Sequence, residues 1–334
     1  MSRMQLHVFF DEPEENYRCG DTITGRIKIT ALEDTRINKL NVTPMWRTHG
    51  RGNIAKGKLN SFNLFTGTWH KGETYEYFFS FETPLTPHTC VGELVNVDWF
   101  LHIHPDVPFE LDHKPEQKFI LKPALESPLE PSAKSGCSKA SPFLMLLFLL
   151  PFFGVGLFFM FLSGNMLLKG EAVGAFIFLF AFIFVCFPSF MFFKIGKQFL
   201  ADYVFGGVTL TLEPNKSHPG ETVRLHIQCK PKTALSALTI QASVKAQEHA
   251  TSGSGTDVSH FNHTIFEEDL PKIFSGELNT QTPFSHTLEI SLPDITPTTL
   301  HLRNNAIKTT IYVMLRTDRH TWEGSQEIIV GSIT

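Results

Sequence analysis

The sequence is poor in cysteine, and none of its cysteines has the spacing of a metal or redox motif. Five occur among 334 residues, with no Cys-x-x-Cys pair: Cys19, Cys90, Cys137, Cys186 and Cys229. This excludes a disulfide scaffold and a zinc ribbon, and it predicts reduced thiols, as in the cytoplasm. For Cys137, just before an apolar stretch, acylation is the alternative to a free thiol.

Other absences narrow the class of function. The formal net charge is -4 and no long basic run is present, which argues against nucleic-acid binding. There is no Gly-x-Ser-x-Gly motif, and the carboxylates at 11–15 and 267–269 are typical of solvated charge runs. The start of the chain, MSRMQLHVFFDEPEEN, has no apolar run resembling a signal peptide. We therefore expect no enzyme activity, no cofactor and a cytoplasmic N-terminus.

In contrast, the middle of the chain is rich in apolar residues. Of 32 phenylalanines, 16 lie between Phe143 and Phe193, and the stretches 142–162 and 172–193 carry no charge. As helices, both are long enough to cross a hydrocarbon core of roughly 30 Å. We predict a transmembrane hairpin over 142–193, embedded in the lipid bilayer.

The lysines around this hairpin predict its orientation. Four flank it on the outside, against only Lys169 between the helices: Lys134, Lys139, Lys194 and Lys197. The positive-inside rule then places both flanking regions in the cytoplasm, at the inner or plasma membrane. The connector 194–206 follows without a break, and we expect the second helix to continue into it. Glycines within the helices permit close helix contact, so a homo-oligomer is a further expectation.

Outside the hairpin, both halves of the chain alternate apolar and polar residues in short runs. ITGRIKITA and YEYFFSFE are examples from 1–122, and TVRLHIQCK and AIKTTIYVMLR are examples from 207–334. Neither half contains an amphipathic helix of useful length, so each is predicted to be an antiparallel β-sandwich. The segment 123–141 is rich in Pro and Ser and is typical of an extended linker.

The two halves also share landmarks in the same order. Gly-Asp-Thr-Ile at 20–23 matches Gly-Glu-Thr-Val at 220–223, and the turn at 84–87 has a counterpart at 293–297. We therefore predict a tandem duplication of one sandwich.

These landmarks resemble the arrestin fold. YRCGDTITGRIKITALEDTRINKLNV (17–42) is similar to its first strands, FFSFETPLTPHTCVGELVNVDWFLHI (78–103) to later paired strands, and SHPGETVRLHIQC with SLPDITPTT to its C-domain. The resemblance implies a non-catalytic, two-sandwich adaptor that binds other proteins, here a membrane-embedded member of the kind expected in a prokaryote. Because a membrane hairpin separates the halves and no Pro-Pro-x-Tyr motif follows, it does not extend to receptor binding or ligase recruitment.

Two candidate sites remain. In WRTHGRGN (46–53) the glycines are typical of a hairpin turn, because no helix follows to form a phosphate loop. Arg47, His49 and Arg51 are left as candidate contacts for an acidic or phosphate-bearing protein partner. The second half has QEHATSGSGT at the equivalent place, with Glu248 and neutral residues instead.

Histidines form the other candidate. His102, His104 and Asp106 alternate in HIHPD, with His113 nearby, a pattern that can hold zinc or copper. We expect Pro105 to disturb that strand, which favours an exposed polar face over a metal site. His260 and His263 are predicted to lie in a solvated loop.

The sequence thus predicts a mainly β protein: two arrestin-like sandwiches with a helical transmembrane hairpin between them, acting as a membrane-anchored adaptor or scaffold. Two alternatives stay open. In the first, the protein is a structural subunit of a membrane complex and its hairpin makes the essential contact. In the second, it is a metal-dependent enzyme that uses the His102/His104 face.

Overall fold

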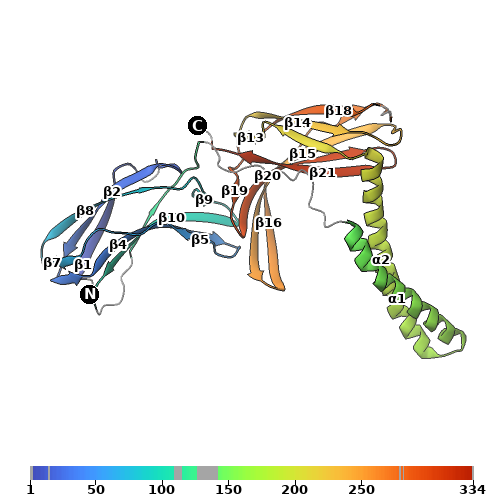
Figure 1. Cartoon of the computed structure of the whole chain (residues 1–334), viewed down its shortest axis with the longest axis horizontal. Helices are drawn as coiled ribbons and strands as arrows, with labels where there is room; N and C mark the ends of the chain where they lie inside the picture. The colour runs from blue at the N-terminus through green and yellow to red at the C-terminus, as the bar shows by residue number, and fades with distance from the viewer. Residues whose placement is uncertain are drawn as a thin grey trace.

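The computed structural model describes residues 3–13, 16–108, 115–125, 142–277, 280 and 282–332. Two sheet-rich halves lie end to end, and two long helices leave the C-terminal half (Figure 1). The expected class, mainly β with two long apolar helices between sheet-rich halves, is confirmed.

The N-terminal sandwich has a three-stranded sheet, β1-β2-β8, and a larger sheet with the path β11-β10-β4-β5. Its strands are β1 (Met4–Phe10), β2 (Thr22–Ala31), β3 (Thr35–Ile37), β4 (Lys39–Gly50), β5 (Lys56–Lys58), β6 (Phe62–Asn63), β7 (Gly67–Trp69), β8 (Thr74–Glu82), β9 (Cys90–Val91), β10 (Val95–Asp106) and β11 (Glu116–Phe119). Alternating residues of the two sheets form one core between them, with Ile27, Trp69 and Trp99 fully buried.

The C-terminal sandwich repeats this plan, with sheets β12-β14-β18 and β13-β21-β20-β15-β16. Its strands are β12 (Thr209–Glu213), β13 (Lys216–Ser217), β14 (Thr222–Cys229), β15 (Leu238–Ser254), β16 (Asp257–Asp269), β17 (Ile273–Ser275), β18 (Phe284–Ser291), β19 (Leu300–His301), β20 (Asn305–Arg316) and β21 (Thr321–Val330). In both halves a central antiparallel pair, β10-β4 or β20-β15, lies inside the larger sheet. The matching strand order agrees with the predicted duplication.

Two details of the strands differ from expectation. β10 continues through Pro105 to Asp106, because Pro105 pairs with Leu40 of β4 and needs no N–H on that side. His260 and His263 lie in β16, a long strand rather than a loop, because β16 pairs along most of β15 and forms a projecting two-stranded arm (Figure 1).

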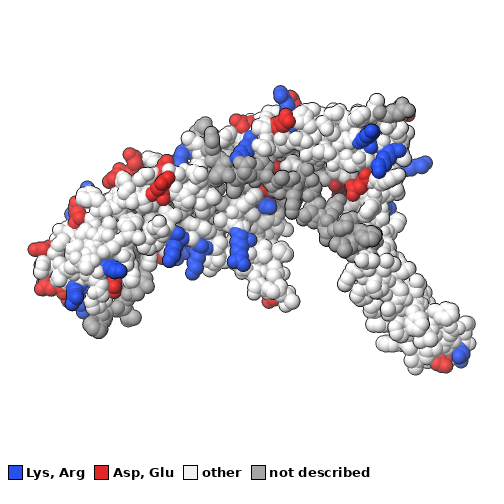
Figure 2. Space-filling view, viewed as in Figure 1, with Lys and Arg blue, Asp and Glu red and all other residues white. Residues whose placement is uncertain are grey.

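The helices are α1 (Pro142–Leu168) and α2 (Ala172–Phe205), which pack against each other. Their apolar side chains are largely exposed, Phe161 to 74% and Phe176 to 76%. In Figure 2 the helical hairpin is almost free of charge until its far end. Exposed apolar surface of this length suits lipid rather than water, and both helices are long enough to cross a membrane.

Glycine brings the two helices close together. A Cβ at Gly156 would lie 2.9 Å from the backbone carbon of Phe184, and one at Gly174 would lie 2.9 Å from Met166. These two glycines therefore serve contact within the hairpin. A Cβ at Gly154, by contrast, would meet no atom of another described element within 4 Å.

We expect Gly156→Leu to lower the free energy of unfolding of the hairpin by about 2 kcal/mol, since overpacking of a tight contact typically has this effect. SDS titration of the full-length protein in mixed micelles, followed by helicity, measures the loss. Gly154→Leu is the matched control and should change the midpoint little. Equal midpoints for the two variants would contradict the packing argument.

α2 is also part of the C-terminal sandwich. Ala201, Val204 and Phe205 are buried in its core, and the amide of Lys232 donates to the carbonyl of Val204 at 3.0 Å. The helix ends at Phe205 and is capped by Gly206, which adopts φ 72° and has the carbonyl of Lys230 so close that no Cβ fits. α2 thus continues past Phe193 into the connector and ends at Phe205, and it is fixed to the C-terminal sandwich.

Candidate functional site

The outer face of the larger N-terminal sheet carries most of the predicted contact residues. In the antiparallel register Arg47 of β4 lies opposite both Asp98 of β10 and Lys56 of β5. Directly opposed residues share a face, so charged side chains from three neighbouring strands meet there. β11 extends the row, with Lys118 opposite Phe100 and Glu116 opposite His102.

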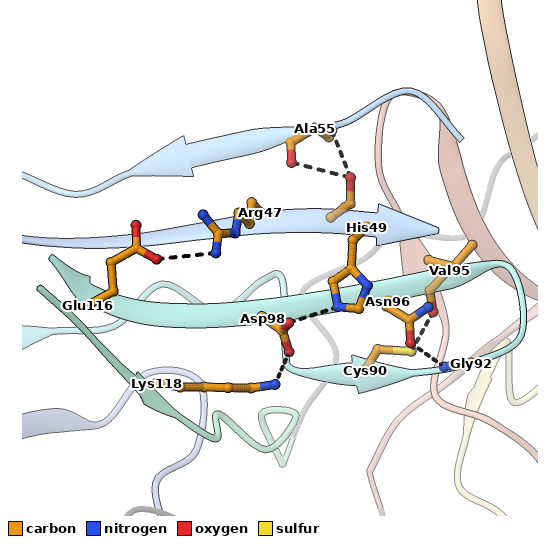
Figure 3. Close-up of polar contacts among 11 residues, drawn as sticks. Arg47, His49, Ala55, Cys90, Gly92, Val95, Asn96, Asp98, Glu116 and Lys118 are labelled. Carbon is orange, nitrogen blue, oxygen red and sulfur yellow. Dashed lines mark hydrogen bonds and ion pairs between the residues drawn. The ribbon is translucent and has the colours of Figure 1, made fainter. Parts of the chain in front are cut away.

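Arg47 is held in place by two neighbours, of which Figure 3 shows Glu116. One of its guanidinium nitrogens, Nη2, lies 3.2 Å from Oε2 of Glu116, and the guanidinium carbon lies 4.2 Å from the centre of the Phe100 ring. The Arg47 side chain is still 46% exposed. An exposed ion pair of this kind contributes on the order of 0–1 kcal/mol, so the guanidinium can exchange partners at little cost.

His49 and Lys118 share one carboxylate, that of Asp98. Nε2 of His49 lies 2.8 Å from one Asp98 oxygen, and Nζ of Lys118 lies 2.6 Å from the other (Figure 3). Burial raises the pKa of the Asp98 carboxyl, but the hydrogen bonds and charges of Lys118 and His49 outweigh it and bring the pKa below its ordinary value. Asp98 is therefore a fixed anion at neutral pH that orients two basic side chains.

Cations outnumber anions on this face. Lys56 and Lys58 are exposed on β5, and neither lies within ion-pair distance of a carboxylate in the part of the chain that is described. Figure 2 shows Lys and Arg side chains gathered on this side of the molecule, between the N-terminal sandwich and the β15–β16 arm. We call these residues the basic face: Arg47, His49, Lys56, Lys58 and Lys118.

Arg51, the third predicted contact residue, is elsewhere. Its guanidinium lies 5.7 Å from the Phe261 ring of β16, in the C-terminal half. Residues 51–55 connect β4 to β5 as a hairpin turn, and Gly50 has φ 134°. Gly52 is needed for a different reason, since a Cβ there would lie 2.3 Å from Oδ1 of Asn305.

The turn after β4 is thus docked onto the C-terminal sandwich. The backbone N–H of Asn53 donates to the carbonyl of Thr251, and the Asn53 side chain both donates to and accepts from the backbone of Gly253. The backbone carbonyl of Asn53 accepts a hydrogen bond from the side chain of Asn305. The predicted hairpin turn therefore has a structural role, and WRTHGRGN divides into a basic face at Arg47 and His49 and a domain contact from Arg51 to Asn53.

A buried carboxylate holds the same interface. Glu248 of β15 is 3% exposed and accepts backbone N–H bonds from Glu93, Leu94 and Val95 at 2.6 to 3.1 Å. Gly92 makes room for it, because a Cβ there would lie 2.4 Å from Oε1 of Glu248. Around this contact an apolar cluster joins the halves: Val95, Val97, Ala250, Leu300 and Ile307. The two sandwiches therefore pack directly on each other.

The histidine candidates do not assemble a metal centre in the described residues. His102 and His104 stack with ring centres 6.4 Å apart, and no group of three His, Cys, Asp or Glu side chains able to hold a metal ion occurs within the described ranges. His113 lies outside those ranges, as does Cys137. On β16, His260 contacts Thr251, and His263 lies opposite Glu248. Neither histidine belongs to a group of three possible metal ligands among the described residues.

The described cysteines of the two sandwiches are poor nucleophiles. Burial raises the pKa of Cys19 to about 12 and those of Cys90 and Cys229 to about 11. The thiols are consequently protonated at neutral pH, whereas cysteine chemistry requires the thiolate.

Sequence reasoning missed five residues of this site: Lys56, Lys58, Asp98, Glu116 and Lys118. The alternation in VNVDWFLHI places Asp98 on the same face as His102 and was a usable signal. β11 is only four residues long, and no pattern in the sequence predicts that it pairs with β10. The proximity of Lys118 to Asp98 could therefore not be predicted.

Comparison with known proteins gives little further guidance. No protein-family model and no curated protein matches the sequence. Among solved structures, that of Spo0M, a sporulation control protein from Bacillus subtilis, overlaps this chain with a TM-score of 0.32 and 15% identity. The overlap covers 37% of this chain and 51% of Spo0M, so it spans about half of that protein. A likeness this loose carries no argument about function.

Proposed function

We propose that this protein is a membrane-anchored, non-catalytic adaptor that binds an acidic or phosphorylated segment of another protein on its basic face. The arrestin-like landmarks of both halves and the end-to-end packing of two sandwiches support the adaptor class. The apolar exposed helices support anchoring in the cell membrane. The lysines around the hairpin favour an orientation with both sandwiches in the cytoplasm.

The observation that carries the proposal is the surplus of positive charge on an exposed sheet face. Arg47, Lys56, Lys58 and Lys118 converge there against the two carboxylates of Asp98 and Glu116. Asp98 is fixed by its own partners, but Glu116 holds Arg47 only through an exposed contact. A carboxylate or phosphate of a partner can replace Glu116, and arginine is well suited to either group.

The absence of a catalytic role is supported by the chemistry of the described groups. The buried thiols have raised pKa values, and His49 and Lys118 are engaged with Asp98 rather than with a nucleophile. Binding through charge also agrees with the position of the basic face, which lies open on the side toward which the β15–β16 arm projects (Figures 1 and 2).

Reversing the charge of the basic face tests this function. We expect Lys56→Glu/Lys58→Glu to lower recovery of the cross-linked partner from intact membranes at least tenfold, because loss of two cation contacts removes about 1.4 kcal/mol or more. Mass spectrometry should locate the wild-type cross-links in acidic or phosphorylated segments of that partner. The matched control, Arg26→Glu/Lys28→Glu, reverses two exposed charges on the outer face of β2 and should leave recovery unchanged.

Equal recovery from both double variants would overturn the basic face as the contact surface. If recovery is instead abolished by exchanging 142–193 for an unrelated helical hairpin, with the flanking lysines and the buried end of α2 retained, the hairpin makes the essential contact. The adaptor proposal requires that such an exchange be tolerated.

A further inference from the structure

A second basic site lies where α2 meets the C-terminal sandwich. A cleft of ≈ 880 Å³ is lined by α2 residues between Met191 and Ala201, by the turn between β20 and β21, and by the first residues of β21. Its volume is within the range of small-molecule sites. Figure 2 shows Lys and Arg side chains gathered at this junction.

The cleft is strongly cationic. Lys194 and Lys197 enter it from α2, and Arg319 enters it from the β20–β21 turn, with His320 beside it. None of the three cations lies within ion-pair distance of a carboxylate in the described part of the chain, and the cleft contains a single acidic side chain, Glu323. The charges are therefore available to an external anion.

The position of the cleft relative to a bilayer follows from where the apolar stretch of α2 ends. Lys194 directly follows Phe193, the last residue of the uncharged segment, and Nζ of Lys197 lies 4.4 Å from the centre of the Phe193 ring. Lys194 and Lys197 are separated by roughly 4.5 Å along the helix axis, whereas the headgroup layer is roughly 5–8 Å thick. If α2 spans the bilayer, both ammonium groups lie among the headgroups.

Trp322 provides a fixed apolar wall. Its ring covers Gly324, where a Cβ would lie 2.2 Å from the ring, and it packs against the core of the C-terminal sandwich. Tryptophan is characteristic of the interface between lipid and water, since its ring is apolar and its N–H is polar. Cations from two elements and an indole ring thus surround one space at headgroup depth.

We propose that this cleft binds the phosphate of an anionic phospholipid headgroup. Arg319 is positioned to donate two hydrogen bonds to phosphate oxygens, Lys194 and Lys197 neutralise the charge, and the glycerol and first acyl carbons lie against Trp322 and α2. The bound lipid would link α2 to the β20–β21 turn. This inference rests on the membrane anchoring in the proposed function, but it does not depend on the basic face.

The test uses full-length protein in a non-ionic detergent and three soluble probes: dihexanoyl phosphatidylglycerol, dihexanoyl phosphatidylcholine and glycerol 3-phosphate. Native mass spectrometry measures the dissociation constant of each. We expect phosphatidylglycerol to bind at least tenfold more tightly than either other probe, because only it combines net negative charge with acyl carbon.

Variants assign the binding to the cleft. Lys197→Gln/Arg319→Gln removes two exposed charges and should weaken phosphatidylglycerol binding at least tenfold, with an unchanged melting temperature in the absence of lipid. Lys56→Gln/Lys58→Gln removes the same amount of charge from the basic face and should leave phosphatidylglycerol binding unchanged. Equal loss in both variants would show nonspecific attraction and overturn the site.

The other outcomes are equally decisive. Equal binding of the two lipids would exclude recognition of net charge, and equally tight binding of glycerol 3-phosphate would make the ligand a soluble phosphate instead of a lipid.

Failure of the proposed function is detected by separate measurements. Loss of the protein from carbonate-washed membranes would disprove anchoring, and unchanged partner recovery in Lys56→Glu/Lys58→Glu would disprove the adaptor contact, whatever the lipid measurement shows.

Discussion

Replacing Glu248 by leucine is expected to lower the free energy of unfolding by about 3–6 kcal/mol. The carboxylate is 3% exposed and accepts three backbone N–H bonds from residues 93–95 of the other sandwich. Leucine fills a similar volume but accepts none of them. A buried donor without a partner, as the Val95 amide would be, costs about 1–3 kcal/mol, and the part-buried amides of Glu93 and Leu94 cost less each. The loss should be concentrated at the contact between the sandwiches.

Urea denaturation of the full-length protein, followed by tryptophan fluorescence, measures this loss. Hydrogen exchange at residues 93–95 should rise in parallel, because their amides lose their acceptor. Glu248→Gln retains a single acceptor oxygen and should fall between the wild type and leucine. The exposed Glu289 provides a control, since Glu289→Leu removes only a surface contact with Arg224. A loss below about 1 kcal/mol in Glu248→Leu would contradict the role of this carboxylate.

The second large effect is a pH dependence that originates in His88. This residue is 8% exposed, because it follows Pro87, whose carbonyl accepts a hydrogen bond from the indole of Trp99 in the core. Burial lowers the pKa of His88 from 6.5 to about 4. Since the folded state disfavours the charged form, His88 lowers stability progressively as pH falls from 6.5 to about 4, and it has no such effect above pH 6.5.

The full difference corresponds to about 3 kcal/mol, because each unit of pKa shift equals 1.36 kcal/mol. His88→Met has no titrating group at this position. Its stability relative to the wild type, from urea denaturation at several pH values, should therefore improve by about 3 kcal/mol between pH 7 and pH 4. His7→Met, at an exposed position, is the control and should run parallel to the wild type. Parallel curves for His88→Met would show that His88 is hydrated in solution.

Much of the fold followed from local patterns. The alternation in ITGRIKITA, YEYFFSFE and TVRLHIQCK predicted β2, β8 and β14, because one face of each strand is buried in a sandwich core. The strand β16 was missed, since its exposed residues lack an apolar alternation and only its pairing with β15 makes it a strand. Pro105 was expected to interrupt β10 because its neighbour across the sheet was unknown.

The candidate site was less accessible to sequence reasoning. Arg47 and His49 were predicted from residue type alone, but their partners Glu116 and Asp98 are far away in the chain. Arg51 was grouped with them because it is a basic residue of the same short stretch, WRTHGRGN. In the structure the turn after Gly50 redirects Arg51 to Phe261 of the other sandwich, so it belongs to a different surface.

By itself the sequence determined the β class, the repeat of two halves and the apolar helical hairpin, because each depends on periodicity or on the length of a run. Only the tertiary structure decided how the halves meet. Glu248 stood in the sequence as an acidic residue at the place that Arg47 occupies in the other half. It is a domain contact because folding brings three amides from residues 93–95 to its carboxylate, an arrangement that no local pattern encodes.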